Sequence, residues 1–123
     1  MDGLYNYKVE HVVSIYDGDT MTVDIDLGFN MTMKKQTLRL YGINTPELRG
    51  GTVETKEAGK LVRDIVREMV AEAKEVYIRS HYDKSGKYGR ILATVILIDD
   101  DDVEIDLNEF LVKNDHAVEY MKK

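Results

Sequence analysis

Apolar and polar residues alternate along the first third of the chain, in three segments joined by short turns. The alternation is strict in residues 20–28 and returns in residues 31–40, and residues 7–16 make a plausible earlier strand. A period of two is typical of strands that bury one face and expose the other. The first third therefore predicts a meander of three strands, in which Met31 and Met33 are core residues.

The next segment changes to a helical period. From Ala58 to Ala73, apolar residues recur at spacings of three and one, which places them on one face of an amphipathic helix. Thr55 is a candidate for the N-cap of this helix. A second, shorter helix is predicted from Asp106, which stands three residues before Glu109 in an approximate capping box.

Two further strands are predicted in residues 75–82 and 90–98. Five strands with a helix after the third are compatible with an α+β, mainly β fold, a five-stranded OB-type barrel with two packed helices. The pattern alone also permits other α+β folds. A chain of 123 residues can bury one core but not two, so residues 1–123 are predicted to be a single domain.

Composition narrows the classes of function. The chain has no cysteine, which excludes disulfides, zinc-thiolate sites and thiol nucleophiles. A formal charge of −6 argues against coating nucleic acid by bulk electrostatics, although a small cationic site can work within an acidic shell. No apolar run is long enough to span a membrane, and no signal peptide is visible. We expect a monomeric cytoplasmic protein, or a secreted one if a leader has been removed.

Four short motifs place polar groups where predicted strands end. They are "DGDT" (17–20), Arg39 in "LRL", "NTPE" (44–47) and "KYGR" (87–90). Each has an ordinary interpretation as a turn or as surface charge. Together they contain what phosphodiester hydrolysis needs, namely carboxylates for a hard cation and for the attacking water, and guanidiniums for the charge of the transition state. Spacing does not show whether the chain brings them together.

The order of these motifs, with the amphipathic helix between the last two, resembles the staphylococcal (thermonuclease-like) nuclease family. The resemblance extends from about Val12 to Ala117. It implies a five-stranded OB-fold barrel with packed helices. It also implies a Ca²⁺-dependent phosphodiesterase that cleaves DNA and RNA at the 5′-oxygen side and leaves 3′-phosphate ends.

The resemblance assigns a metal site to three residues. Asp19 falls on a carboxylate ligand, and Thr45 falls on the position that offers its backbone carbonyl. Asn44 occupies the position of a second ligand aspartate. An amide oxygen can bind Ca²⁺ but brings no negative charge, and the number of charged ligands helps to set the affinity. We expect calcium binding to be weaker by roughly 1–3 kcal/mol, about ten- to a hundredfold in dissociation constant.

The remaining assignments concern the reaction and the substrate. By the resemblance, Glu47 is the general base or orients the attacking water, and Arg39 and Arg90 bind the phosphate and stabilise the transition state. Lys87 and Tyr88 contact the phosphate of the nucleotide. A helix and two tyrosines that follow in the family have no clear counterpart here. The alternative function is an OB-fold nucleic-acid-binding module that has lost turnover.

Overall fold

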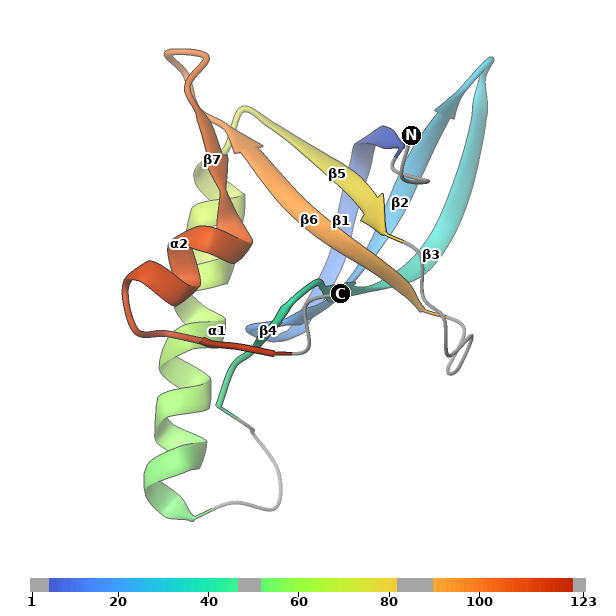
Figure 1. The fold of residues 1–123 in the computed structure, drawn as a ribbon. Helices are drawn as coiled ribbons and strands as arrows, with labels where there is room; N and C mark the ends of the chain where they lie inside the picture. The colour runs from blue at the N-terminus through green and yellow to red at the C-terminus, as the bar shows by residue number, and fades with distance from the viewer. Residues whose placement is uncertain (1–4, 47–51, 82–89, 121–123) are drawn as a thin grey trace.

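The computed structural model describes residues 5–46, 52–81 and 90–120. Five long strands form a barrel in which β3 closes on β6 in parallel, while the other barrel neighbours are antiparallel (Figure 1). These strands are β1 (Asn6–Asp17), β2 (Thr20–Gly28), β3 (Met31–Leu40), β5 (Glu75–His81) and β6 (Ile91–Ile98). The five-stranded barrel with two helices confirms the predicted fold class.

Three short strands extend this barrel. The strand β7 (Glu104–Asp106) pairs with β6, and β4 (Ile43–Asn44) pairs with β8 (Val118–Glu119). The β4–β8 pair ties the segment after β3 to the end of the described chain, because the Tyr120 amide also donates to the Gly42 carbonyl. Short strands of this kind give no clear periodic signal, and the sequence pattern did not separate them from loops.

Two helices pack against the barrel. The long helix α1 (Val53–Glu72) begins earlier than predicted, because Thr52 and not Thr55 is its N-cap and accepts a hydrogen bond from the Thr55 amide. The short helix α2 (Leu107–Lys113) begins as predicted, with the Asp106 carboxylate accepting from the Glu109 amide. Neither helix is both long and apolar enough, among the described residues, to cross a membrane.

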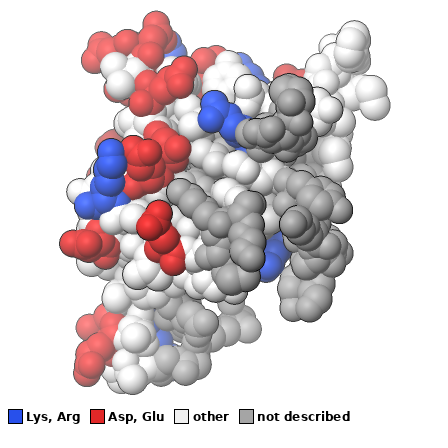
Figure 2. Space-filling model, viewed as in Figure 1, with Lys and Arg blue, Asp and Glu red and all other residues white. Residues whose placement is uncertain are grey.

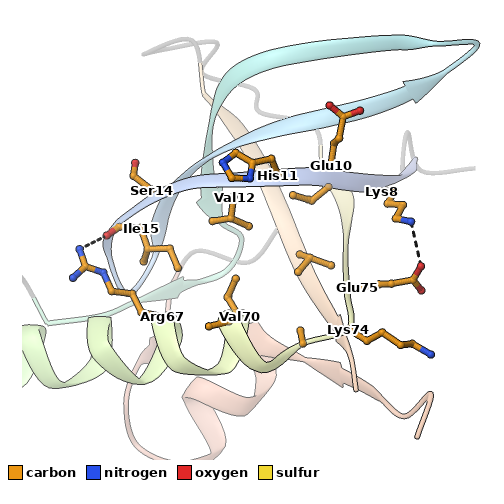
Figure 3. A pocket seen from close by; sticks show the side chains of 14 residues that line it. Lys8, Glu10, His11, Val12, Ser14, Ile15, Arg67, Val70, Lys74 and Glu75 are labelled. Atoms are coloured by element: carbon orange, nitrogen blue, oxygen red, sulfur yellow. Dashed lines mark hydrogen bonds and ion pairs between the residues drawn. The ribbon is translucent and has the colours of Figure 1, made fainter. Parts of the chain in front are cut away.

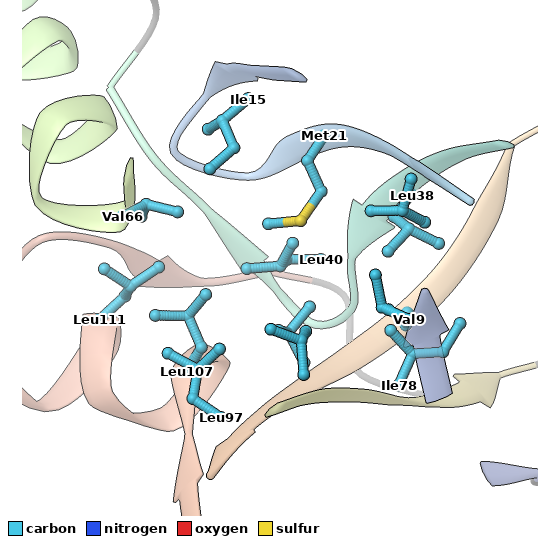
Figure 4. Packing of buried hydrophobic residues seen from close by; sticks show 14 of the residues in the cluster. Val9, Ile15, Met21, Leu38, Leu40, Val66, Ile78, Leu97, Leu107 and Leu111 are labelled. Carbon is cyan, nitrogen blue, oxygen red and sulfur yellow. The ribbon is translucent and has the colours of Figure 1, made fainter. Parts of the chain in front are cut away.

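The core fills the barrel and the space beneath the helices (Figure 4). Met21, Leu38 and Leu40 from the meander belong to the same buried cluster as Val66 of α1 and Leu111 of α2. These side chains are at most 1% exposed, and burying each of this size contributes about 1.5–3 kcal/mol. The meander and both helices therefore share one core, which makes the position of each strand end depend on the whole domain.

The distal part of the β2–β3 hairpin departs from the predicted alternation. Met31 and Met33 are exposed and not core residues, because the hairpin projects beyond the barrel (Figure 1). Asp24 is buried although strict alternation would place it on the wet face, since the register shifts between Val23 and Ile25. The carboxylate of Asp24 accepts from the Lys35 amide, so its burial is compensated.

Candidate functional site

The base of the β2–β3 hairpin brings two predicted site residues together. Thr20 pairs with Arg39 across the two strands, and the Leu40 amide donates to the Asp19 carbonyl at 2.9 Å. Leu38 and Leu40 point into the core, so Arg39 between them points outward. Asp19 and Arg39 therefore meet at the end of the barrel where β3 passes into β4.

Asp19 is buried and fully engaged by its neighbours. Its Oδ2 accepts from the Thr45 amide at 3.0 Å and lies 3.3 Å from Arg39 Nη1. Its Oδ1 accepts from the Thr20 hydroxyl at 3.1 Å. A buried carboxylate requires such partners, because an unpaired buried charge is strongly destabilising. Asp19 of "DGDT" and Thr45 of "NTPE", 26 positions apart, thus belong to one polar cluster with Arg39.

Asp17, which precedes Asp19 by two residues, is part of the same cluster. Its Oδ1 accepts from the Asp19 amide at 3.1 Å. Burial and, after it, the neighbouring Asp19 carboxylate together raise the pKa of Asp17 to about 6. Burial also acts to raise the pKa of Asp19, but the hydrogen bonds from Asp17 and the Thr45 amide and the charge of Arg39 outweigh it and lower that pKa. Asp19 is therefore the member of the pair that loses its proton first as the pH rises.

Asn44 contacts Arg39. The Arg39 Nη2 donates to Asn44 Oδ1, and Nη1 donates to the Leu40 carbonyl at 3.1 Å. The guanidinium is thereby held from three sides, by an amide oxygen, a backbone oxygen and the Asp19 carboxylate. The structure thus brings together Asp19, Arg39, Asn44 and Thr45, four of the eight residues that the sequence nominated.

Gly18 is required by packing. A Cβ at this position would lie 2.6 Å from Val62 Cγ1 and 2.9 Å from Thr45 Cγ2. Helix α1 and the turn after β4 therefore approach the "DGDT" backbone more closely than any side chain allows.

We expect Gly18→Ala to lower the free energy of unfolding by about 1–3 kcal/mol, because overpacking forces Val62 and Thr45 to move. Urea denaturation measures this change. Gly28→Ala makes an informative comparison, since Gly28 has open space around it and its positive φ of 80° is the only obstacle. A Gly18→Ala variant with unchanged stability would contradict the close packing.

Arg90 stands directly before β6, the strand that pairs with the end of β3. Arg39 pairs with Leu92 across the parallel β3–β6 contact, and Arg90 stands two residues before Leu92. Because Ala93 is fully buried, Arg90 and Leu92 lie on the outward face that also carries Arg39. The two predicted phosphate-binding arginines thus share one face. Glu47, Lys87 and Tyr88 lie outside the described residues.

The oxygen atoms of the cluster are suitable ligands for a hard cation. Carboxylate, amide and hydroxyl or carbonyl oxygens are what Ca²⁺ prefers, and Asp19, Asn44 and Thr45 offer only oxygens. Thr45 Oγ1 is buried and has no hydrogen-bond partner among the described residues, so an oxygen is left over in the cluster. No group of three His, Cys, Asp or Glu side chains converges within the described part of the chain. Any cation here would rely on few charged ligands.

Asn108 supports this site and was missed by sequence reasoning. Its Nδ2 donates to the carbonyls of Tyr41 and Ala93, each at 3.0 Å, and its Oδ1 accepts from the Val95 amide at 3.1 Å. The side chain locks the end of β3 to β6, the two strands that carry the arginines. The available signal was an asparagine on the buried face of α2, between Leu107 and Leu111.

The chain is similar to known proteins. Residues 37–123 match the family described as staphylococcal nuclease homologue. The chain belongs to this family. It is 35% identical over 94 residues to the thermonuclease of Staphylococcus hyicus, a match that covers 75% of this chain and 50% of that protein. The chain thus spans about half the length of the curated relative.

The charge of this staphylococcal nuclease homologue is unevenly distributed on the face shown in Figure 2. Acidic side chains gather over α1, α2 and the turn before β7, where Asp99–Asp102 lie, whereas the side of the β2–β3 hairpin carries few of them. A polyanion would be repelled from the helical side. Binding would therefore depend on cations close to the site.

A large hollow lies elsewhere on this homologue. It measures about 660 Å³ and lies between β1 and the second half of α1, where Arg67 donates to the Ile15 carbonyl (Figure 3). Val12 and Val70 line its apolar part, and Lys8 and Glu75 form an ion pair at its rim. None of the five predicted site residues within the described part of the chain lines it.

Proposed function

We propose that this protein is a Ca²⁺-dependent phosphodiesterase that hydrolyses DNA or RNA and leaves 3′-phosphate ends. The observation that carries the proposal is the convergence of Asp19, Arg39, Asn44 and Thr45 at one end of the barrel. Family membership and the similarity to a thermonuclease support the same class of reaction.

In this mechanism Arg39 and Arg90 bind the non-bridging oxygens of the scissile phosphate from one face. A guanidinium donates two parallel hydrogen bonds to a phosphate, and its charge counts most when the negative charge on those oxygens increases in the transition state. The two arginines therefore contribute both to substrate binding and to the rate of hydrolysis, and their contribution to the rate is the larger of the two.

Glu47 is assigned to the attacking water. It accepts a proton from the water or orients it, the water oxygen bonds to phosphorus, and the bond to the 5′-oxygen breaks. The leaving 5′-oxygen takes up a proton, and the 3′-phosphate remains on the other product. Pro46 limits the backbone conformation before Glu47, which favours a set direction for its carboxylate.

Asp19, Asn44 and Thr45 would hold the cation. When bound, Ca²⁺ would supply Lewis-acid polarisation of a phosphate oxygen. Asp19 is suited to this role because its lowered pKa keeps it ionised at neutral pH. Asn44 contributes an oxygen without charge, so we expect half-maximal cleavage at millimolar Ca²⁺.

A second candidate is a nucleic-acid-binding module without turnover. The amide at position 44 and its hydrogen bond from Arg39 favour it, because both reduce what the cluster offers to a cation. The two functions differ in one measurable product. Only the enzyme releases new phosphate ends.

The test is incubation of single-stranded DNA and of RNA with millimolar Ca²⁺ or with a chelator, followed by end-group analysis. We expect cleavage with Ca²⁺ only, 3′-phosphate ends, and at least a hundredfold loss in Asp19→Asn, because the remaining ligands carry too little charge. Intact substrate that is nevertheless bound would establish the binding module. Cleavage that persists in the chelator would refute the metal requirement.

A further inference from the structure

The Arg39 guanidinium lies against the oxygens that the proposed function assigns to the cation. Its Nη1 is 3.3 Å from Asp19 Oδ2, and its Nη2 donates to Asn44 Oδ1. The side chains of Arg39 and Asp19 are only 14% and 11% exposed, so little water screens this contact. One positive charge of the protein thus lies where a second positive charge is proposed to bind.

We propose that Arg39 and the divalent cation compete for Asp19 and Asn44, and that Asn44 is the positioning residue that holds Arg39 there. This inference rests on the proposed function and adds a step to it. The cation needs as ligands Asn44 Oδ1, which accepts a hydrogen bond from the guanidinium, and Asp19 Oδ2, which forms an ion pair with it. Cation binding therefore releases Arg39, which becomes available to the phosphate.

The identity of residue 44 sets the balance of this competition. Asparagine is an uncharged acceptor for Arg39 and an uncharged ligand for the cation. A carboxylate in its place would strengthen both contacts, so part of what the cation gains would be cancelled by the tighter hold on Arg39. With Arg39 removed, the added carboxylate would serve the cation alone. Competition thus predicts coupling between residues 39 and 44.

The experiment is a double-mutant cycle for Ca²⁺ affinity, measured by titration calorimetry on the full chain without nucleic acid. The four proteins are the natural chain, Arg39→Gln, Asn44→Asp and the double variant. We expect about tenfold tighter binding in Arg39→Gln, because a hydrogen bond and an ion pair with the guanidinium no longer hold the ligand oxygens. We expect Asn44→Asp to tighten binding as well.

The double variant gives the decisive number. We expect its Ca²⁺ affinity to be at least about threefold higher than the value obtained by multiplying the effects of the two single variants. An interaction between contacting residues appears as this kind of non-additivity. A charge-matched control is Arg63→Gln on α1, whose Nε lies 3.3 Å from Asp64. It removes the same charge without touching the cluster, and we expect its affinity to change by less than twofold.

A second variant covers the case in which Arg39→Gln does not fold, as judged by circular dichroism. Arg39→Lys keeps the charge but lacks the fork that reaches two acceptors, so we expect a smaller tightening of the same sign. Equal or weaker Ca²⁺ binding in the folded Arg39 variants, or an Arg63→Gln effect of the same size, would overturn the inference while leaving Ca²⁺-dependent cleavage intact. Absence of binding in all variants would overturn both the inference and the calcium part of the proposed function.

Discussion

Arg39→Ala should lower the rate of phosphodiester hydrolysis by roughly a thousandfold at saturating Ca²⁺, the size found when one preorganised charge or donor is removed from a transition state. Of the three groups that hold Arg39, the Leu40 carbonyl is not a proposed ligand of the cation, so this contact can still orient the guanidinium when Ca²⁺ is bound and limit the entropy lost in the transition state. The dissociation constant of the substrate should change by no more than about tenfold.

Single-turnover kinetics with a single-stranded oligonucleotide separate these two quantities. The matched control is Arg79→Ala, which removes an exposed arginine of β5 whose Nε donates to Asn6 Oδ1. We expect its rate and affinity to stay near those of the natural chain. A folded Arg39→Ala variant with full turnover would refute the catalytic assignment, and a loss confined to substrate affinity would reduce Arg39 to a binding residue.

Asn108→Ala should lower the free energy of unfolding by about 3 kcal/mol. Truncation removes three hydrogen bonds, one donated by the Val95 amide and two accepted by the carbonyls of Tyr41 and Ala93, and of these groups the Ala93 carbonyl still accepts from the Tyr41 amide. Each unsatisfied buried group costs about 1–3 kcal/mol, and relaxation recovers part of the total. Since these groups join β3 to β6, the same variant should also loosen the arrangement of Arg39 and Arg90.

Urea denaturation measures the effect, and Asn114→Ala is the control. Asn114 makes one exposed hydrogen bond, from Nδ2 to the Phe110 carbonyl at 2.9 Å, so its loss should stay within about 0.5 kcal/mol. Asn108→Asp tests the direction of the bonds, because a carboxylate keeps the acceptor for Val95 but has no donor for the two carbonyls. An Asn108→Ala loss below about 1 kcal/mol would show that water satisfies the three groups.

The fold was largely predictable because its long elements have strong periods. The strand at Thr20–Gly28 and the helix that starts after Asp106 lie where the pattern placed them. Errors arose where tertiary structure overrides a local pattern. Met31 and Met33 alternate like core residues but lie on a hairpin that no other element covers, and a register shift buries Asp24.

The candidate site was predictable as a set of residues but not as an arrangement. Motif order nominated Asp19, Arg39, Asn44 and Thr45, and their roles stay predictions. Their contacts depend on β3 turning into β4 while β2 begins beside it, which no local pattern encodes. The contact of Asn44 with Arg39 follows from this arrangement and could not be predicted from the sequence. The same is true of the hydrogen bonds by which Asn108 joins the end of β3 to β6.

By itself, the sequence determined the barrel class, the absence of cysteine chemistry and the residue types available for phosphodiester hydrolysis. Periodicity specifies which face of a helix or strand is buried, because that face is set by the spacing of apolar residues within the element itself. Only the tertiary structure decided which charges meet. Whether Asp19 faces a cation or Arg39 depends on distances of a few ångströms between segments far apart in the chain, and electrostatic energies in a buried cluster change steeply over such distances.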